Sequence, residues 1–420
     1  MLMERGTDLE AKTVDGFTPL HFCSQYGMSE IAEMLLERGV DLNARGKNRC
    51  TPLHLCSQYG TTDTATRMLA ERGGDLDART EEGWTPLHVC SHHGTAEIAK
   101  TLLEHGVDAE AKENDNWTPL HVCSQHGTTE IAKMLMETGV DLDARTNRCW
   151  IALHICSLYG VADIAKMLVE RVADLEAKDN GGCTPLHLCS HRGTTDIAEM
   201  LVERGVDLEV EGKDGWTPLH ICAQYGTTEM ARMLMARGVY LQTRENRGWT
   251  PLHLCSQHGT IKIPTMLMER GVDLEAKTNE GLTAMHVCAQ HGTVEVATLL
   301  ANIGANLEAK EDRGWTPLHF CSYHGSTEIA IMLIERGVGV EMRTNESATP
   351  LDISFLASSI EIRTMLMERS IDLEATTREG TTLSQLYSRR ENTEIGSMPT
   401  ERVVALALKD NEGRRPLRFL

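Results

Sequence analysis

A four-residue motif, Thr-Pro-Leu-His, recurs along the chain at an almost constant interval, and no other feature constrains the fold as strongly. Copies begin at Thr18, Thr51, Thr85, Thr118, Thr184, Thr217, Thr250 and Thr316, and altered copies begin at Ile151, Thr283 and Thr349. Neighbouring copies start 33 residues apart, except for one interval of 34. A period of this length indicates stacked units rather than the roughly three separate domains that the length alone would suggest.

Each unit has the pattern of two short helices joined by a glycine. In the first unit, Thr18 suits a helix N-cap and Pro19 the first helical position, where a missing N–H costs nothing. Gly27 ends the first helix and Gly39 the second. The expected buried residues are Leu20, Cys23 and Ser24 in the first helix and Ile31, Met34 and Leu35 in the second. Since neither helix can bury its apolar side alone, the units must stack into an all-α solenoid.

The period, the motif, the glycine between two helices and the segment Gly-Val-Asp-Leu-Glu-Ala-Lys together resemble the ankyrin repeat. The resemblance is strong over about residues 13–380. It implies antiparallel helix pairs with a β-hairpin-like finger between successive pairs. It also implies a concave groove lined by the fingers and the first helices, where ankyrin repeats commonly hold partners.

The same register gives the domain organisation. Residues 1–12 match the tail of a preceding repeat, and residues 13–376 form eleven repeats, numbered here by their motifs. Residues 377–409 are a degenerate twelfth repeat, expected to act as a C-terminal cap, and residues 410–420 resemble the start of another. The chain therefore looks like part of a longer repeat protein.

Four repeats depart from the shared pattern. Repeat two has one extra residue in its second helix, which predicts a π-bulge or a shifted helix start. In repeat five, Ile151 and Ala152 replace the Thr and Pro, and Val172 replaces the terminating glycine. Pro264 falls within the second helix of repeat eight, which is tolerable only if that helix begins late. In repeat eleven, Asp352 replaces the motif histidine.

Most cysteines and histidines fall in two fixed positions of the repeat. These are Cys23, Cys56, Cys90, Cys123, Cys156, Cys189, Cys222, Cys255, Cys288 and Cys321, with His21, His54, His88, His121, His154, His187, His220, His253, His286 and His319. A ladder of metal sites is one interpretation. However, residues i and i+2 of a helix diverge by about 200°, so one ion cannot easily take both. We favour cysteine as a small buried apolar residue, and the resemblance implies a structural hydrogen-bonding histidine. No metal or cofactor is predicted.

Three further cysteines, Cys50, Cys149 and Cys183, lie at or next to the position before the motif. This part of the finger is expected to be exposed, so these thiols are candidates for adventitious oxidation. A regulatory thiol is the alternative.

Two rows of residues are candidates for the partner-binding surface. The first row, just before the motif, contains all six tryptophans: Trp84, Trp117, Trp150, Trp216, Trp249 and Trp315. The second row, at the end of the first helix, contains Tyr26, Tyr59, His93, His126, Tyr159, Tyr225, His258, His291 and His324. The resemblance implies that both rows face the groove, and such residues are enriched in binding hot spots. The alternative for the tryptophans is that each one only packs along adjacent fingers. The second-row histidines are either solvated polar residues or groups that make binding pH-sensitive.

Composition excludes several classes of function. The chain has 61 acidic and 41 basic residues, a net charge of −20, which argues against a surface for nucleic-acid phosphates. It lacks an apolar run of about 18 residues for a membrane helix, and its first residues lack the apolar core of a signal peptide. A reducing compartment, the cytosol or the nucleus, is therefore expected, and in it the cysteines are expected to be thiols rather than disulfides.

No catalytic motif is present: the sequence has no phosphate-binding glycine loop, no G-x-S-x-G and no H-E-x-x-H. We therefore predict a non-catalytic scaffold that binds a protein partner, basic or amphipathic in character, along the groove. The alternative is the recognition arm of a larger signalling protein or enzyme, such as a receptor or a ligase, whose effector domain is missing from this chain.

Overall fold

A computed structural model describes residues 8–70, 74–357 and 359–369. Over these ranges the chain forms 22 α-helices, one 3-10 helix (Lys47–Arg49) and no strand, which confirms the all-α solenoid. The chain divides into two compact units, Met1–Lys213 and Asp214–Leu420. The predicted degenerate repeat at 377–409 and the partial repeat at 410–420 lie outside the described residues.

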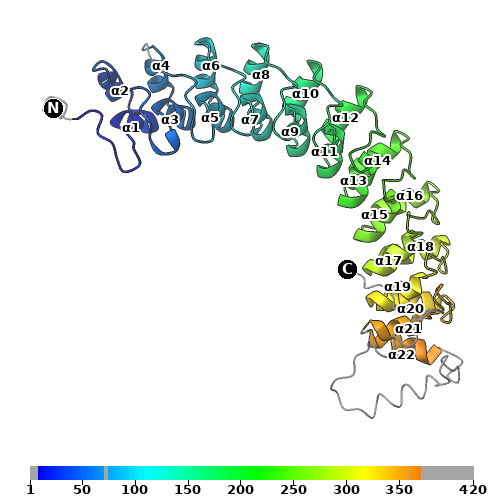
Figure 1. The fold of residues 1–420 in the computed structure, drawn as a ribbon. Coiled ribbons are helices and arrows are strands. Elements are labelled where there is room, and N and C mark those ends of the chain that lie inside the picture. Colours follow the sequence, from blue (N-terminus) through cyan, green and yellow to red (C-terminus); the bar gives the residue numbers. More distant parts are fainter. Residues whose placement is uncertain (1–7, 71–73, 358, 370–420) are drawn as a thin grey trace, which may run out of the picture. The chain divides into compact units, whose positions relative to one another are not determined.

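The N-terminal unit holds repeats one to six, each with a first and a second helix (Figure 1). Its first helices are α1 (Pro19–Tyr26), α3 (Pro52–Tyr59), α5 (Pro86–His93), α7 (Pro119–His126), α9 (Ala152–Tyr159) and α11 (Pro185–Arg192). Its second helices are α2 (Ser29–Leu36), α4 (Thr62–Ala70), α6 (Ala96–Glu104), α8 (Thr129–Glu137), α10 (Ala162–Glu170) and α12 (Thr195–Glu203). First helices pack on first helices and second on second, so the unit has two helical layers.

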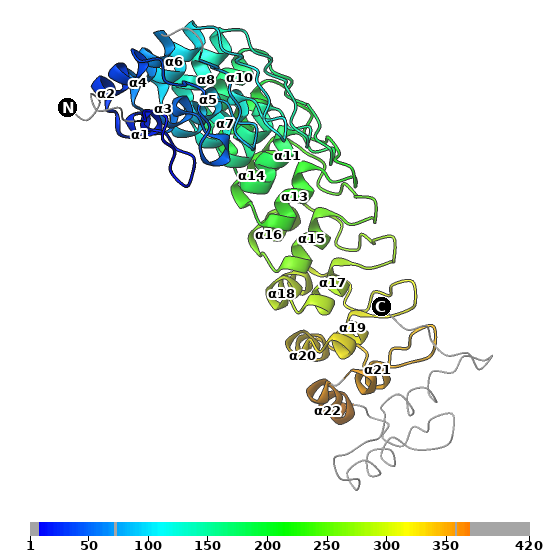
Figure 2. The same cartoon turned by 60° about the vertical axis from the view of Figure 1, so that its left-hand side comes forward.

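The C-terminal unit repeats this arrangement over repeats seven to eleven. Its first helices are α13 (Pro218–Tyr225), α15 (Pro251–His258), α17 (Ala284–His291), α19 (Pro317–His324) and α21 (Pro350–Leu356). Its second helices are α14 (Thr228–Ala236), α16 (Lys262–Glu269), α18 (Val294–Ile303), α20 (Thr327–Glu335) and α22 (Ile360–Arg369). Figure 2 shows the loops that join successive repeats projecting to one side of these helices.

In repeats one to ten, the first helix begins directly after the first motif residue and ends before a glycine, as the sequence predicts. At α5, Pro86 takes the first helical position, and the backbone N–H of Thr85 donates to Nδ1 of His88 over 3.2 Å. The helix ends at Gly94, whose φ of 78° is accessible to glycine at little cost. These local interactions fix the length of the helix at eight residues.

The core forms between layers and between repeats. In repeat three, Leu87, Cys90, Ile98, Ala99 and Leu102 are at most 1% exposed. Burying a side chain the size of Leu or Ile contributes about 1.5–3 kcal/mol. Stacking therefore supplies most of the stability that the short helices lack on their own.

The predicted buried stripe of α2 is wrong at two of its three positions. Ile31 and Met34 are 42% and 46% exposed, whereas Ala32, Leu35 and Leu36 are buried. In later repeats the position of Ile31 is covered by the second helix of the repeat before. Among the described residues, no second helix precedes α2, so this side of it stays open.

The irregular repeats keep the helix pair, with local adjustments. Helix α4 begins at the same position after its motif as α8 does, so the shifted start predicted for repeat two is wrong, and no π-bulge occurs over Thr62–Ala70. Helix α16 begins one position late, as predicted, which places Pro264 in its first turn. In repeat five, Ile151 is fully buried and its N–H still donates to Nδ1 of His154. Val172 adopts a φ of 64°, the conformation that glycine has in other repeats.

Candidate partner-binding surface

The motif histidines join a first helix to the finger that follows it. Nδ1 of His54 accepts the N–H of Thr51 at 3.2 Å, so the ring proton lies on Nε2, which donates to the carbonyl oxygen of Trp84 over 3.0 Å. Burial lowers the pKa of His54 to about 4, so the ring is neutral. The same pKa and pattern of contacts recur at His88, His121, His220, His253, His286 and His319. The predicted structural role of this histidine is confirmed.

The motif cysteines are small buried side chains, as predicted. Cys90 and Cys123 are completely buried, and burial raises the pKa of both thiols to about 11. Because the motif histidines already use both ring nitrogens, a metal bond would break one of these hydrogen bonds. Among the described residues, no group of three or more His, Cys, Asp or Glu side chains is arranged to hold a metal ion.

The three finger cysteines are half-buried, so the prediction that they are exposed is wrong. Neighbouring fingers bind each other through backbone hydrogen bonds, such as Glu81 N–H to the Asn48 carbonyl at 2.9 Å, and so shield the position between them. Burial raises the pKa of Cys50 to about 11, which leaves little reactive thiolate at neutral pH. Cys149 and Cys183 are also free cysteines.

Each tryptophan lies at the base of a tight finger turn. In repeat three, Thr80 N–H donates to the carbonyl of Trp84 at 2.9 Å, and Gly83 N–H donates to Thr80 at 3.0 Å. All six tryptophans are half-buried. Trp150 packs along the fingers, since its Nε1 donates to Asp179 of the next repeat at 3.0 Å. Trp117, Trp216 and Trp249 lie beside their motif histidines, with ring centroids 6.0–6.3 Å apart.

Every side chain of the second row is exposed, in both units. Tyr26 is 64% exposed and Tyr225 56%, and the five second-row histidines are exposed as well. The row is held in place from the repeat before: Nε2 of Gln125 donates to the hydroxyl of Tyr159 at 3.1 Å. The first helices that carry the second row therefore have one face in the core and present a ring at their C-terminal end.

The two rows come into contact at repeats three and four. The ring of Trp84 lies 5.6 Å from that of His92, which lies 4.4 Å from His93 and 4.1 Å from His126. Partial burial, together with the neighbouring imidazole of His92, lowers the pKa of His93 and His126. These rings form a continuous surface from a finger to two first helices.

A second contact between the rows occurs in repeat ten. The ring of Trp315 lies 5.5 Å from Phe320 and 5.7 Å from Tyr323, and Tyr323 lies 5.0 Å from His324. Phe320 and Tyr323 were not among the predicted binding residues. Their signal in the sequence is the position of Tyr323, where most repeats have Gln or His.

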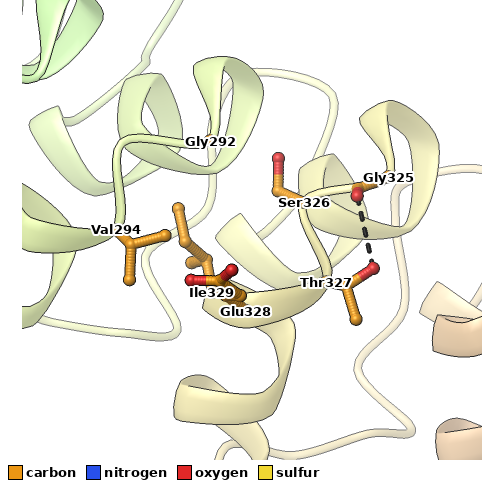
Figure 3. A pocket seen from close by; sticks show the side chains of 7 residues that line it. All are labelled: Gly292, Val294, Gly325, Ser326, Thr327, Glu328 and Ile329. Carbon is orange, nitrogen blue, oxygen red and sulfur yellow. Dashed lines mark hydrogen bonds between the residues drawn. The ribbon is translucent and has the colours of Figure 1, made fainter.

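A shallow pocket of about 310 Å³ lies between the helix turns of repeats nine and ten (Figure 3). Its lining is Gly292, Val294, Gly325, Ser326, Thr327, Glu328 and Ile329. The hydroxyl of Thr327 donates to the Gly325 carbonyl at 3.4 Å. Glu328 is the one ionisable side chain in this lining, so the pocket lacks a paired acid and base for catalysis.

Helix length and polarity decide whether a helix can span a membrane. Over the part of the chain that the structure describes, every helix is too short or too polar to cross a bilayer.

The comparison with protein families agrees with the fold. A family model of ankyrin repeats in three copies matches residues 1–80, 53–146, 143–212, 208–278, 241–311, 265–345 and 285–377. The crystal structure of the human ASB11 ankyrin repeat domain matches with 24% sequence identity and a TM-score of 0.49, covering 53% of this chain and 99% of that domain. No curated protein sequence matches.

Proposed function

Because the chain belongs to the ankyrin-repeat family, whose members are generally protein–protein interaction modules and typically non-catalytic, we propose that it is a non-catalytic scaffold. It binds a partner protein along the second row of rings together with the tryptophans at the finger bases. The observation that carries this proposal is that every second-row side chain, in each of the two units, is exposed on a helix whose other face is buried in the core. No observation favours the recognition arm of a larger enzyme or receptor.

The rings supply contact area at a low entropic cost. Tyrosine and histidine have few rotatable bonds, and the helices that carry them are fixed by core packing and by the motif histidines. A partner therefore meets a preorganised surface, and little of the binding free energy is spent on ordering it.

The chemistry of the surface indicates the kind of partner. The finger tips carry exposed acids such as Glu81, Glu82 and Asp115, in a chain with a net charge of −20. The tyrosines and histidines of the row add apolar and hydrogen-bonding groups. A basic or amphipathic segment fits both features. A cytosolic or nuclear location stays a prediction.

The test begins with a pull-down by the full chain and identification of the bound protein by mass spectrometry. Replacing Tyr225 and His258 with Ala should then weaken binding of that protein at least about tenfold, since both side chains are exposed hot-spot candidates. Replacing Trp216 and Trp249 with Ala should abolish binding and leave the helical circular dichroism intact. Titration calorimetry measures both effects.

A matched control is Ile331→Ala, on the second helix α20, whose side chain is 38% exposed. It should bind with unchanged affinity. Retained affinity in the folded Tyr225 and His258 variant would refute the proposed binding surface.

A further inference from the structure

Repeat seven lacks a set of acidic side chains at the end of its second helix and in the following loop. The three positions hold Glu269, Asp273 and Glu275 in repeat eight, and Ala236, Tyr240 and Gln242 in repeat seven. Each of the other ten repeats keeps at least one acid there. The change is therefore confined to one place in the sequence.

Charge changes in the same place. Residues 217–282, which hold repeats seven and eight, contain seven basic and six acidic residues, although the whole chain has a net charge of −20. Lys262 contributes to this difference, because it stands at the start of α16 where α14 has Glu229. Long-range attraction of an anionic segment is strongest where such a chain is locally basic.

A pocket lies at this point, between the loops that follow α14 and α16, with a volume of about 580 Å³. Its lining is Val239, Tyr240, Leu241, Gln242, Thr243, Arg270, Gly271 and Val272. Tyr240 is 73% exposed, while Val239 and Val272 form a buried apolar floor at 8%. Arg270 is the one charged residue in the lining, and Arg237, the exposed C-cap of α14, lies three residues before Tyr240.

Two polar side chains of the pocket, those of Gln242 and Arg270, have groups available to a ligand. In the next repeats, an acid accepts the backbone N–H of the following loop: Glu275 accepts from Asn306 and Glu308 from Gly339, both at 2.7 Å. No such bond joins the side chain of Gln242 to Asp273 in the described structure. The guanidinium of Arg270 donates from Nη1 to the carbonyl of Met266 at 3.2 Å, which leaves most of its N–H groups for a carboxylate.

We propose that this pocket is a second docking site, for an acidic peptide segment that carries an aromatic or branched apolar side chain. The apolar side chain enters between Tyr240 and Val272, and flanking carboxylates pair with Arg237 and Arg270. The amide of Gln242 binds the peptide backbone. The site lies on the loops after the second helices, whereas the proposed scaffold surface lies on the first helices and fingers, so the two sites can be tested separately.

The experiment pans a phage-displayed peptide library against the full-length chain, with the double variant Tyr240→Asp/Gln242→Glu as counter-selection. This variant gives repeat seven the same pair that repeat eight carries, Asp273 and Glu275, so it should fold with an equal or higher melting temperature. Enriched peptides should be acidic and contain an aromatic or aliphatic residue. Synthetic copies should bind the wild type at least about tenfold more tightly than the double variant, with an affinity that falls as salt is raised.

The variant Tyr225→Ala, on the proposed scaffold surface, should bind these peptides as well as the wild type does. Failure to enrich any peptide would overturn the proposal, as would enrichment of basic peptides or equal binding to the double variant. Competition by a single-stranded oligonucleotide that binds the same pocket more tightly than the peptides would also overturn it, since the ligand would then be a nucleic acid.

Discussion

Helix α7 carries two histidines, five residues apart, in opposite environments. His121 is 1% exposed, and its two nitrogens bind Thr118 N–H at 3.1 Å and the Trp150 carbonyl at 3.2 Å. His126 is exposed, and its ring lies 4.1 Å from His92 of the repeat before. The same residue type thus holds the stack together at one position and is available to a partner at the other. Position in the repeat, more than residue type, assigns the role.

The largest expected effect is a loss of folding stability in acid, caused by the buried motif histidines. Seven motif histidines have a folded pKa of about 4, whereas the unfolded value is about 6.5. Because the folded pKa is the lower one, the unfolded chain binds more protons between these values. The stability contribution is complete above pH 6.5 and is lost as the pH falls toward 4.

The expected loss is large, since each such histidine loses about 1.4 kcal/mol of its stability contribution for each pH unit between its unfolded and its folded pKa. Guanidinium unfolding followed by circular dichroism at about pH 7.5 and about pH 5.5 measures it, in a range where most Asp and Glu side chains remain ionised. For the seven histidines together, a loss on the order of 10 kcal/mol is expected. Equal stability at the two pH values would show that the motif histidines are not buried as neutral rings.

Single substitutions of the two histidines of α7 should have smaller effects on stability, and they compare the buried and the exposed position directly. His121→Ala should destabilise the fold by about 2–4 kcal/mol, because it leaves the Thr118 N–H and the Trp150 carbonyl without a partner and opens a cavity. His126→Ala should change stability by no more than about 0.5 kcal/mol. Thermal unfolding of both variants checks this, and similar losses at the two positions would remove the distinction.

The sequence predicted the features that depend on local chemistry. Thr85 and Pro86 mark the start of a helix and Gly94 marks its end, and the same residue types do so in other repeats. The helix pairs, the buried cysteines and the structural histidines could therefore be predicted from the repeat pattern. The exposure of Ile31 could not be predicted, because it depends on which helix precedes α2 in the stack. The half-buried state of Cys50 arises from contacts between fingers of different repeats, which a single repeat does not encode.

In the candidate site, too, some features could be predicted from the sequence of one repeat and others could not. Register alone placed the tyrosines and histidines of the second row, because every repeat orients that position alike. The ring contacts of Phe320 and Tyr323 with Trp315 depend on side-chain conformations and on the distance between a finger and its helix. The sequence pattern specifies neither the side-chain conformations nor this distance. The contacts of Phe320 and Tyr323 were therefore found only in the structure.

The central claim is that a partner covers the second row and leaves the second helices open. Hydroxyl-radical footprinting of the full chain, with and without the protein recovered by pull-down, tests it most directly. We predict that the partner protects Tyr225, His258 and Trp249 from oxidation, while Ile331 on α20 is labelled equally in both states. Protection confined to the second helices, with unchanged labelling of Tyr225 and His258, would contradict the account.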